Sequence, residues 1–408
     1  MATQSQMDKE LHKKILDSFP NSRYMGTKRE YNTGQSGEPV FAAQYSSKNN
    51  YGLNGTFIVR IGSASWASAE EALYNSLAKS AFASLLARFH MPSFPVEGQA
   101  AVAYDVAFDS LIEPQPLMNI LDKQVQNKDE VRGQIEGLTY ALVNWYLKNN
   151  PASVVEDQHA LLFRMLTEKR AGDLLERLEG ALPFWSSGTL QITVEGVKQR
   201  LPNPLVYMQK ATWQQLGIEH NSKCFIGRIH GDLHTGNVIC SSTSQQIPHI
   251  IDFDQSMEDG VPFFDLAYLE FDIMRHVLAV EQEGNRRNWI SLLDVSMAKI
   301  EGGEQNLPWD ADRAWGLIQP IRQGVQRLLA SAREDASGRE DYEIVWWLST
   351  VAAGLNFARK GDQTRSRFER MAGLLYAAYG LARILEIFGV KESMTEQTSF
   401  VPWLQKEE

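Results

Sequence analysis

Residues 225–254 constrain the fold of this chain most strongly, because short apolar runs alternate there with groups of polar residues. The segment reads FIGRIHGDLHTGNVIC and, after a polar stretch, HIIDFD. This pattern predicts a strand, a loop, a second strand, a turn and a third strand. The loop contains His230, Asp232 and His234, and Asn237 follows Asp232 by five residues. A metal cluster, a phosphate-transfer loop and a plain polar turn are the three interpretations to compare.

The third run favours oxygen ligands over imidazole. In HIIDFD, strand alternation puts Ile250, Asp252 and Asp254 on one face and His249 on the other. Carboxylate and amide oxygens suit Mg²⁺, particularly where phosphates complete its coordination, whereas imidazole-rich sites suit Zn²⁺. A metal-dependent hydrolase that uses the histidines of the loop is therefore the least favoured alternative. Phosphoryl transfer needs the observed set: a carboxylate to position a hydroxyl, and an amide oxygen with a second carboxylate to hold magnesium.

The pattern of predicted elements indicates an α+β fold with two lobes. A chain of 408 residues exceeds the size at which one core usually keeps growing. Strand patterns occur at residues 40–44, 55–62 and 102–108, with a helical period at 68–89. From residue 129 the chain is mainly helical, with a hairpin predicted around residues 190–205. We expect an antiparallel N-terminal lobe over residues 1–110 and a helical lobe over residues 111–408.

Three sequence blocks in order, HGDLHTGN, IIDFD and GVPFFDLAYLE, resemble the aminoglycoside phosphotransferase and choline kinase family. These blocks cover residues 229–270, and the two-lobed layout extends the resemblance more loosely to residues 30–390. The resemblance implies a protein-kinase-like fold, with a small antiparallel-sheet N-lobe and a larger, mainly helical C-lobe. It also implies transfer of the γ-phosphoryl group of ATP, or of GTP, to a hydroxyl of a small-molecule acceptor, with Mg²⁺.

The same resemblance implies roles for individual residues of the large lobe. Asp232 would be the catalytic base, and Asn237 and Asp252 would be magnesium ligands. His230 would shape the loop, and Asp265 would brace it. Without the resemblance, Asp265 could equally be a helix N-cap.

The N-terminal lobe offers residues for the nucleotide phosphates. A kinase-like small lobe needs a glycine-rich turn, a cation on the next strand and a helix acid that holds the cation. Arg60 lies where the family usually has lysine, and choline kinase-like members are similar in using arginine there. Helical periodicity favours Glu70 over its neighbour as the acid. The turn residues are Gly34, Ser36 and Gly37.

A binding or regulatory module on the same fold is the second interpretation. The segments DLAYLEFD and RLPNPL are similar to phosphotransferase-like domains of bacterial effector or conflict systems, the ternary complex associated domains. Such a module would bind nucleotide or a partner without turnover. The arginine at position 60 keeps this alternative open, whereas the complete set of Asp232, Asn237 and Asp252 favours an enzyme.

Composition limits the partners and the compartment. The net charge of −10 argues against a nucleic-acid binder and would suit a cationic acceptor. No apolar run predicts a signal peptide or a membrane span, so we expect a cytoplasmic protein. The two cysteines, Cys224 and Cys240, are expected as buried thiols rather than as a disulfide. The oligomeric state cannot be predicted from these features.

Two further groups of residues could belong either to a functional site or to the structural framework of the protein. Trp346 and Trp347 fit a helical core better than an aromatic cage for a quaternary amine. The acidic residues that follow the second block could meet a cationic acceptor or could form a solvated face, and Glu270 could instead help to hold the helix after Asp265. These acidic residues are Glu258, Asp259, Glu270 and Asp272.

Overall fold

The structure of the chain is a computed structural model. It describes residues 13, 22–31, 40–47, 55–77, 86–96, 99–105, 115–122, 128–148, 152–178, 188–194, 197–218, 220–240, 247–279, 283–298, 307–331, 336–359, 367–390 and 398–400. Two compact units divide the chain: Met1–Ile120 with Gly236–Gln255, and Leu121–Thr235 with Ser256–Glu408. Where the sequence suggested one boundary near residue 110, the chain crosses between the units three times. The segment with Asn237 and Asp252 belongs to the first unit.

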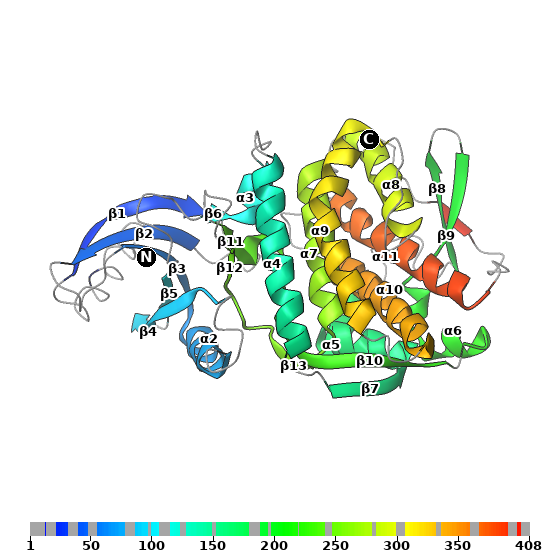
Figure 1. Ribbon diagram of the computed structural model, residues 1–408, viewed down its shortest axis with the longest axis horizontal. Helices are drawn as coiled ribbons and strands as arrows, with labels where there is room; N and C mark the ends of the chain where they lie inside the picture. The colour runs from blue at the N-terminus through cyan, green and yellow to red at the C-terminus, as the bar shows by residue number, and fades with distance from the viewer. Residues whose placement is uncertain are drawn as a thin grey trace. The chain divides into compact units, whose positions relative to one another are not determined.

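A five-stranded antiparallel sheet forms most of the first unit, in the order β1-β2-β3-β5-β4 (Figure 1). Its elements are β1 (Ser22–Tyr31), β2 (Val40–Ser47), β3 (Gly55–Ser63), α2 (Ala64–Leu77), β4 (Arg88–Val96) and β5 (Gln99–Asp105). The antiparallel arrangement predicted from the sequence is confirmed. β1 and β4 are additional to the three strands that the sequence pattern predicted. β4 begins at Arg88, inside the range 68–89 given to a helix, so the end of that helix prediction was wrong.

A second, three-stranded sheet brings the returning segment into the first unit. It has the order β12-β11-β6, formed by β6 (Gln115–Pro116), β11 (Val238–Cys240) and β12 (His249–Ile250). Ile239 and Ile251 pack in one buried core with Ile58, Val102 and other residues of the large sheet and α2. The burial of these apolar side chains fixes the returning strands against the sheet.

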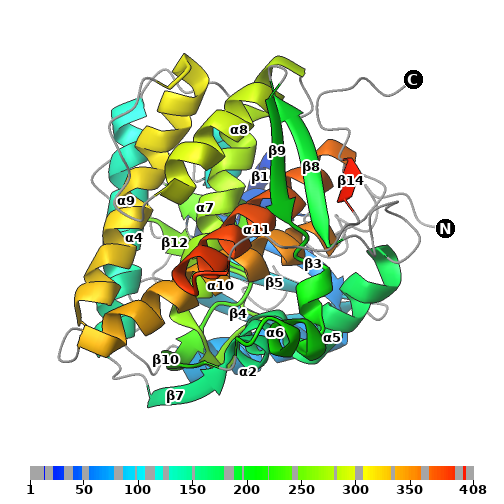
Figure 2. The same cartoon turned by 90° about the vertical axis from the view of Figure 1, so that its right-hand side faces the viewer.

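The second unit is mainly helical and has two small sheets. Its helices are α4 (Lys128–Lys148), α5 (Gln158–Leu178), α6 (Lys210–Gln215), α7 (Pro262–Leu278), α8 (Glu283–Ala298), α9 (Trp309–Ser331), α10 (Ala336–Arg359) and α11 (Arg367–Ile387), and α3 (Leu117–Asp122) spans the first crossing. One sheet, β13-β10-β7, is formed by β7 (Ala152–Asp157), β10 (Asn221–Ile229) and β13 (Met257–Gly260). The other joins the predicted hairpin of β8 (Thr189–Val194) and β9 (Val197–Pro202) to β14 (Thr398–Phe400), as Figure 2 shows.

Helix α7 runs through the core of the second unit. Pro262 stands at its start, where a missing N–H and a fixed φ are favourable, and Ala279 ends it in the left-handed conformation. Its residues are buried on almost every side, including Asp265, Glu270 and Asp272. Buried carboxylates are costly unless they are paired, so these three must have partners within the unit.

Helices α10 and α11 pack closely side by side (Figure 2). A Cβ atom on Gly354 would lie 2.4 Å from the main-chain oxygen of Gly373, so the glycines allow the two backbones to approach.

None of the helices within the described residues has the length and apolar character to span a bilayer. Cys224 and Cys240 are buried free thiols, as predicted.

Candidate functional site

In the first unit, Arg60 and Asp252 form an ion pair. Arg60 lies on β3 with 6% of its surface exposed, and its Nη1 contacts Oδ1 of Asp252. The guanidinium also lies over the ring of Trp66, 4.8 Å from the ring centre. Burial alone would lower the pKa of Arg60, but the Asp252 carboxylate, together with Tyr104 and Glu70, outweighs this effect and the pKa is raised. The strand cation and one expected magnesium ligand are therefore held together.

Asp252 has an unusual backbone conformation. Its φ of 69° lies in the left-handed region, which aspartate adopts more readily than most residues do. Strand β12 ends at Ile250, so the alternation predicted for HIIDFD does not continue to Asp252 and Asp254. The prediction that these residues share a strand face was therefore wrong. Asp254 is exposed, and its Oδ2 accepts a hydrogen bond of 3.2 Å from Gln255.

Asn237 lies beside the segment that contains Asp252. Asn237 ends the short helix η3 (Thr235–Asn237), is 5% exposed, and is followed directly by β11. Its main-chain oxygen accepts the N–H of Ile251 at 3.0 Å, so the two expected ligands stand on adjoining strand ends. An amide oxygen and a carboxylate oxygen are donors that Mg²⁺ prefers. The residues present fit this metal.

Glu70 faces inward from α2, as the helical periodicity predicts, and is fully buried. Its Oε1 accepts the hydroxyl of Tyr104 at 2.5 Å and the N–H of Phe253 at 3.1 Å. Burial, together with the negative charge of Asp252, raises the pKa of Glu70 to about 7 against the opposing effect of these hydrogen bonds. Glu70 thus holds the backbone immediately after Asp252. Its expected role as the partner of Arg60 stays a prediction, and Gly34, Ser36 and Gly37 lie outside the described residues.

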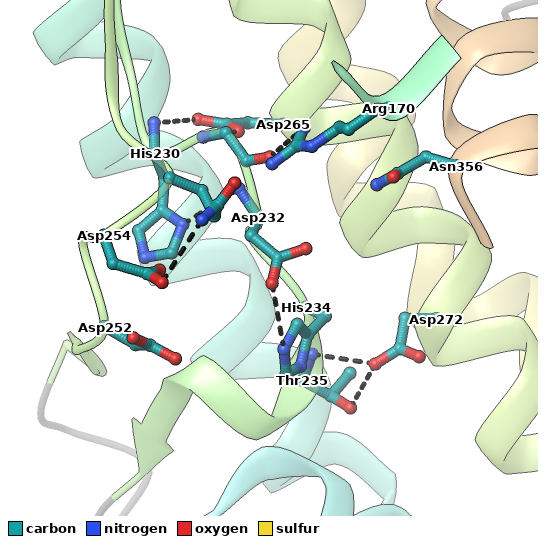
Figure 3. A network of polar contacts seen from close by, with 12 residues as sticks. Arg170, His230, Asp232, His234, Thr235, Asp252, Asp254, Asp265, Asp272 and Asn356 are labelled. Carbon is teal, nitrogen blue, oxygen red and sulfur yellow. Dashed lines mark hydrogen bonds and ion pairs between the residues drawn. The ribbon is translucent and has the colours of Figure 1, made fainter. Parts of the chain in front are cut away.

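In the second unit, Asp265 holds the start of the loop (Figure 3). It is fully buried on α7, and its carboxylate accepts the N–H of His230 at 2.7 Å, the N–H of Gly231 at 2.8 Å and the hydroxyl of Tyr146 at 2.9 Å. Burial raises the pKa of Asp265, although these donors oppose the shift. The N-cap of α7 is Val261, so the N-cap alternative for Asp265 was wrong. These contacts are those of a residue that braces the loop.

The loop turns sharply around Asp232. Gly231 has a φ of 77°, which favours glycine, and the ring Nδ1 of buried His230 accepts the N–H of Asp232 at 3.3 Å. The carboxylate of Asp232 keeps 16% of its side-chain surface exposed, and Nε2 of His234 lies 3.7 Å from its Oδ2. The other end of the turn is fixed, because Asp232 O accepts the N–H of His234 at 3.0 Å. His230 thus shapes the loop.

Two more residues hold the loop: Arg170, which the sequence reasoning missed, and Asp272, which it named only as a residue facing an acceptor or solvent. Nη1 of Arg170, on α5, donates to the main-chain oxygen of Gly231 at 2.9 Å. Asp272, on α7, accepts hydrogen bonds from the N–H and the hydroxyl of Thr235. Burial alone would raise the pKa of Asp272, but Arg275 and nearby histidines hold it well below its usual range. The seven-residue spacing from Asp265 to Asp272, two helical turns, was the available signal.

The remaining acidic residues, Glu258, Asp259 and Glu270, do not form one group that faces an acceptor. Glu258 and Asp259 are exposed, with 81% and 73% of their side chains accessible, and pair with Arg228 and Arg164. Glu270 is fully buried between Arg322, at 2.5 and 2.6 Å, and the hydroxyl of Tyr376, at 2.9 Å. The solvated-face alternative is therefore wrong for Glu270 and Asp272. The contacts of Glu270 match the other alternative, in which it helps to hold α7, and Asp272 holds the loop.

The two adjacent tryptophans belong to the core, as predicted. Trp346 and Trp347 are fully buried on α10. The guanidinium of Arg322 lies over their rings, 5.0 Å and 5.6 Å from the ring centres. A cation of the protein itself therefore occupies the aromatic surface that could have suggested a cage.

Across the residues that the structure describes, no group of three or more His, Cys, Asp or Glu side chains is arranged to hold a metal.

Comparison with known proteins adds a partial family match and distant structural similarities. A sequence profile described as ternary complex associated domain 9 matches residues 176–339, which include the Asp232 loop and α7. No match was found among curated proteins. The chain is similar to a solved ethanolamine kinase of Plasmodium vivax, at 10% identity over 90% of this chain and 82% of that chain, with a TM-score of 0.37. It is also similar to an aminoglycoside-3'-phosphotransferase of type VIII (12% identity, 77% and 98% covered, TM-score 0.34). A choline kinase of Streptococcus pneumoniae gives 12% identity, 95% and 100% covered, and a TM-score of 0.28.

Proposed function

We propose that this protein is a phosphotransferase that moves the γ-phosphoryl group of ATP to a hydroxyl of a small molecule. The observation that carries the proposal is the construction of the Asp232 loop. Buried Asp265, His230 and Arg170 fix its main chain, while the Asp232 carboxylate stays partly exposed. A carboxylate held in this way is ready to orient a hydroxyl and to accept its proton.

In the proposed reaction, a new bond forms between the acceptor oxygen and phosphorus. The bond between the γ-phosphorus and the bridging oxygen breaks, ADP leaves, and the hydroxyl proton passes to a carboxylate oxygen of Asp232. Asn237 and Asp252 would hold Mg²⁺, and Arg60 would bind the phosphates. The metal would supply charge compensation for the phosphate oxygens when it is bound.

The Arg60–Asp252 pair gives the proposal a specific electrostatic feature. Since Asp252 already neutralises Arg60, nucleotide phosphates that entered without Mg²⁺ would add uncompensated negative charge beside Asp252. Phosphates would replace the carboxylate as the partner of Arg60, and the metal would replace Arg60 as the partner of Asp252. We therefore expect nucleotide binding to depend strongly on Mg²⁺.

The test is Mg²⁺-dependent consumption of ATP in the presence of a panel of amino alcohols, aminoglycosides, sugars and proteins. Cationic acceptors are the first choice because the net charge is −10. Asp232→Asn should lower turnover with the successful acceptor by roughly 10²–10⁴-fold, the usual contribution of a general base. The exposed Asp259→Asn is the matched control and should retain wild-type turnover.

A second candidate is a nucleotide-binding regulatory module without turnover. Two observations favour it: the Arg60–Asp252 ion pair, and the match of residues 176–339 to a ternary complex associated domain. This candidate predicts that ATP binds in the presence of Mg²⁺ but that no turnover depends on Asp232, so Asp232→Asn and wild type would give the same result. Lack of nucleotide binding would exclude both candidates.

A further inference from the structure

Helix α7 presents two buried carboxylates to one loop. Asp265 and Asp272 are seven residues apart, which places them on nearly the same face, about 10 Å apart along the helix axis. Asp265 accepts the N–H groups of His230 and Gly231. Asp272 accepts from Thr235, the last residue of this unit before the chain crosses at Gly236 (Figure 3). One helix thus holds both ends of the Asp232 loop.

The two oxygens of Asp272 have separate partners. Oδ2 accepts both the N–H of Thr235, at 2.9 Å, and its hydroxyl, at 2.5 Å. Oδ1 accepts from Nε and Nη2 of Arg275, at 3.1 and 2.9 Å. Arg275 in turn donates to Glu369 on α11 at 2.7 Å. The carboxylate that holds Thr235 is therefore itself fixed to two helices of the core.

The length of the loop makes these two attachments restrictive. The five residues from Gly231 to Thr235 are joined by four Cα–Cα steps, which span at most about 14 Å when fully extended. The attachment points on α7 are about 10 Å apart along the axis, so the loop has little slack between them. A shift at Thr235 would be transmitted to Asp232, three residues before it, and to Asn237, two residues after it.

We propose that Asp272 is a positioning residue that, through Thr235, sets the placement of Asp232 and of the start of the strand segment with Asn237. The inference rests on the proposed function. The alternative is that Asp272 serves only to neutralise Arg275. The side chain of Thr235 separates the two, because changing it leaves the Asp272–Arg275 ion pair in place.

The experiment compares Thr235→Val, which has nearly the same shape but no hydroxyl, with Thr235→Ser, which keeps the hydroxyl. Amide hydrogen exchange is measured for the peptide that contains residues 229–240 and for a reference peptide from α10. Thr235→Val should accelerate exchange in the loop roughly tenfold without changing α10, since a hydrogen bond to a buried charge is lost. Thr235→Ser should remain close to wild type. If the valine variant does not fold, Thr235→Ala takes its place.

The Mg²⁺ concentration that gives half-maximal ATP binding supplies the second readout. We expect it to rise about tenfold in Thr235→Val and to be restored in Thr235→Ser. Equal loop exchange and equal Mg²⁺ midpoints in wild type, valine and serine variants would overturn the positioning role, whatever the turnover. A wild type that binds Mg²⁺ and ATP but transfers no phosphoryl group would instead reject the proposed function, while the variants still decide the role of Asp272. If ATP does not bind, the exchange comparison alone decides it.

Discussion

Replacing Asp265 with asparagine should destabilise the second unit and loosen the Asp232 loop. One oxygen of Asp265 accepts from His230 and Tyr146, and the other accepts from Gly231. Asparagine has the same shape but only one acceptor. If the amide oxygen takes the place of the oxygen that accepts from His230 and Tyr146, the NH₂ group faces the N–H of Gly231. Two donors then meet, and no hydrogen bond forms between them.

The size of the effect follows from this geometry. The variant loses one hydrogen bond to a charged group, about 1.5–3 kcal/mol, and leaves a buried N–H unpaired at about 1–3 kcal/mol. Burial raises the pKa of Asp265, so the neutral side chain recovers part of the cost of burying a charge. We therefore expect a net loss of about 3 kcal/mol. Tyr146→Phe removes one bond to the same carboxylate but no contact with the loop, and should cost about 1.5 kcal/mol.

Urea denaturation followed by tryptophan fluorescence measures both variants, with amide exchange at Gly231 as the local probe. The asparagine variant should exchange at Gly231 at least about tenfold faster than the phenylalanine variant. An asparagine variant as stable as the phenylalanine variant, with a protected Gly231 amide, would refute the claim that Asp265 braces the loop.

Three other predictions concern packing, pH and a buried charge. Gly354→Ala should destabilise the protein by at least about 2 kcal/mol, because its Cβ meets main-chain atoms of α11; Gly133→Ala, where nothing lies within 4 Å, should be neutral or stabilising in the same thermal melt. Burial raises the pKa of Glu70 from 4.5 to about 7, so the folded first unit keeps a proton that the unfolded chain has lost. Stability should therefore fall as pH rises through this window, by up to about 1.4 kcal/mol per pH unit, and Glu70→Gln should flatten the urea-midpoint profile. Arg322→Met should cost about 3–5 kcal/mol by leaving Glu270 buried without its cation, and adding Glu270→Gln should recover part of the loss; no recovery would contradict this electrostatic explanation.

Local sequence patterns predicted the elements whose partners are close in the chain. The strand alternation around Arg60 and the helical period around Glu70 both reflect which side of a single element is apolar. These local patterns were therefore sufficient to indicate the antiparallel lobe. The family resemblance carried by HGDLHTGN and the later FFDLA, rather than any local pattern, implied that Asp265 braces the loop. The contacts of Asp265 with His230 and Gly231 have that form.

The features that the sequence did not predict depend on distant partners or on single backbone angles. The sequence left open whether Glu270 faces solvent or holds the helix, because its cation, Arg322, is 52 residues away in the chain. The left-handed conformation of Asp252 ends the expected alternation, and aspartate tolerates this conformation without marking it in the sequence. The return of residues 236–255 to the first unit follows from packing of Ile239 and Ile251, which resemble any strand residues in the sequence.

The most direct test of the central claim is single-turnover transfer of the labelled γ-phosphoryl group from ATP to the acceptor, in wild type and Asp232→Asn. The proposal predicts that the labelled product forms only with Mg²⁺, and that the variant is slower by roughly 10²–10⁴-fold with ATP affinity changed by less than about threefold. Equal transfer rates in the two proteins would contradict the assignment of Asp232. Binding of ATP without labelled product in either protein, across the whole acceptor panel, would contradict the phosphotransferase function itself.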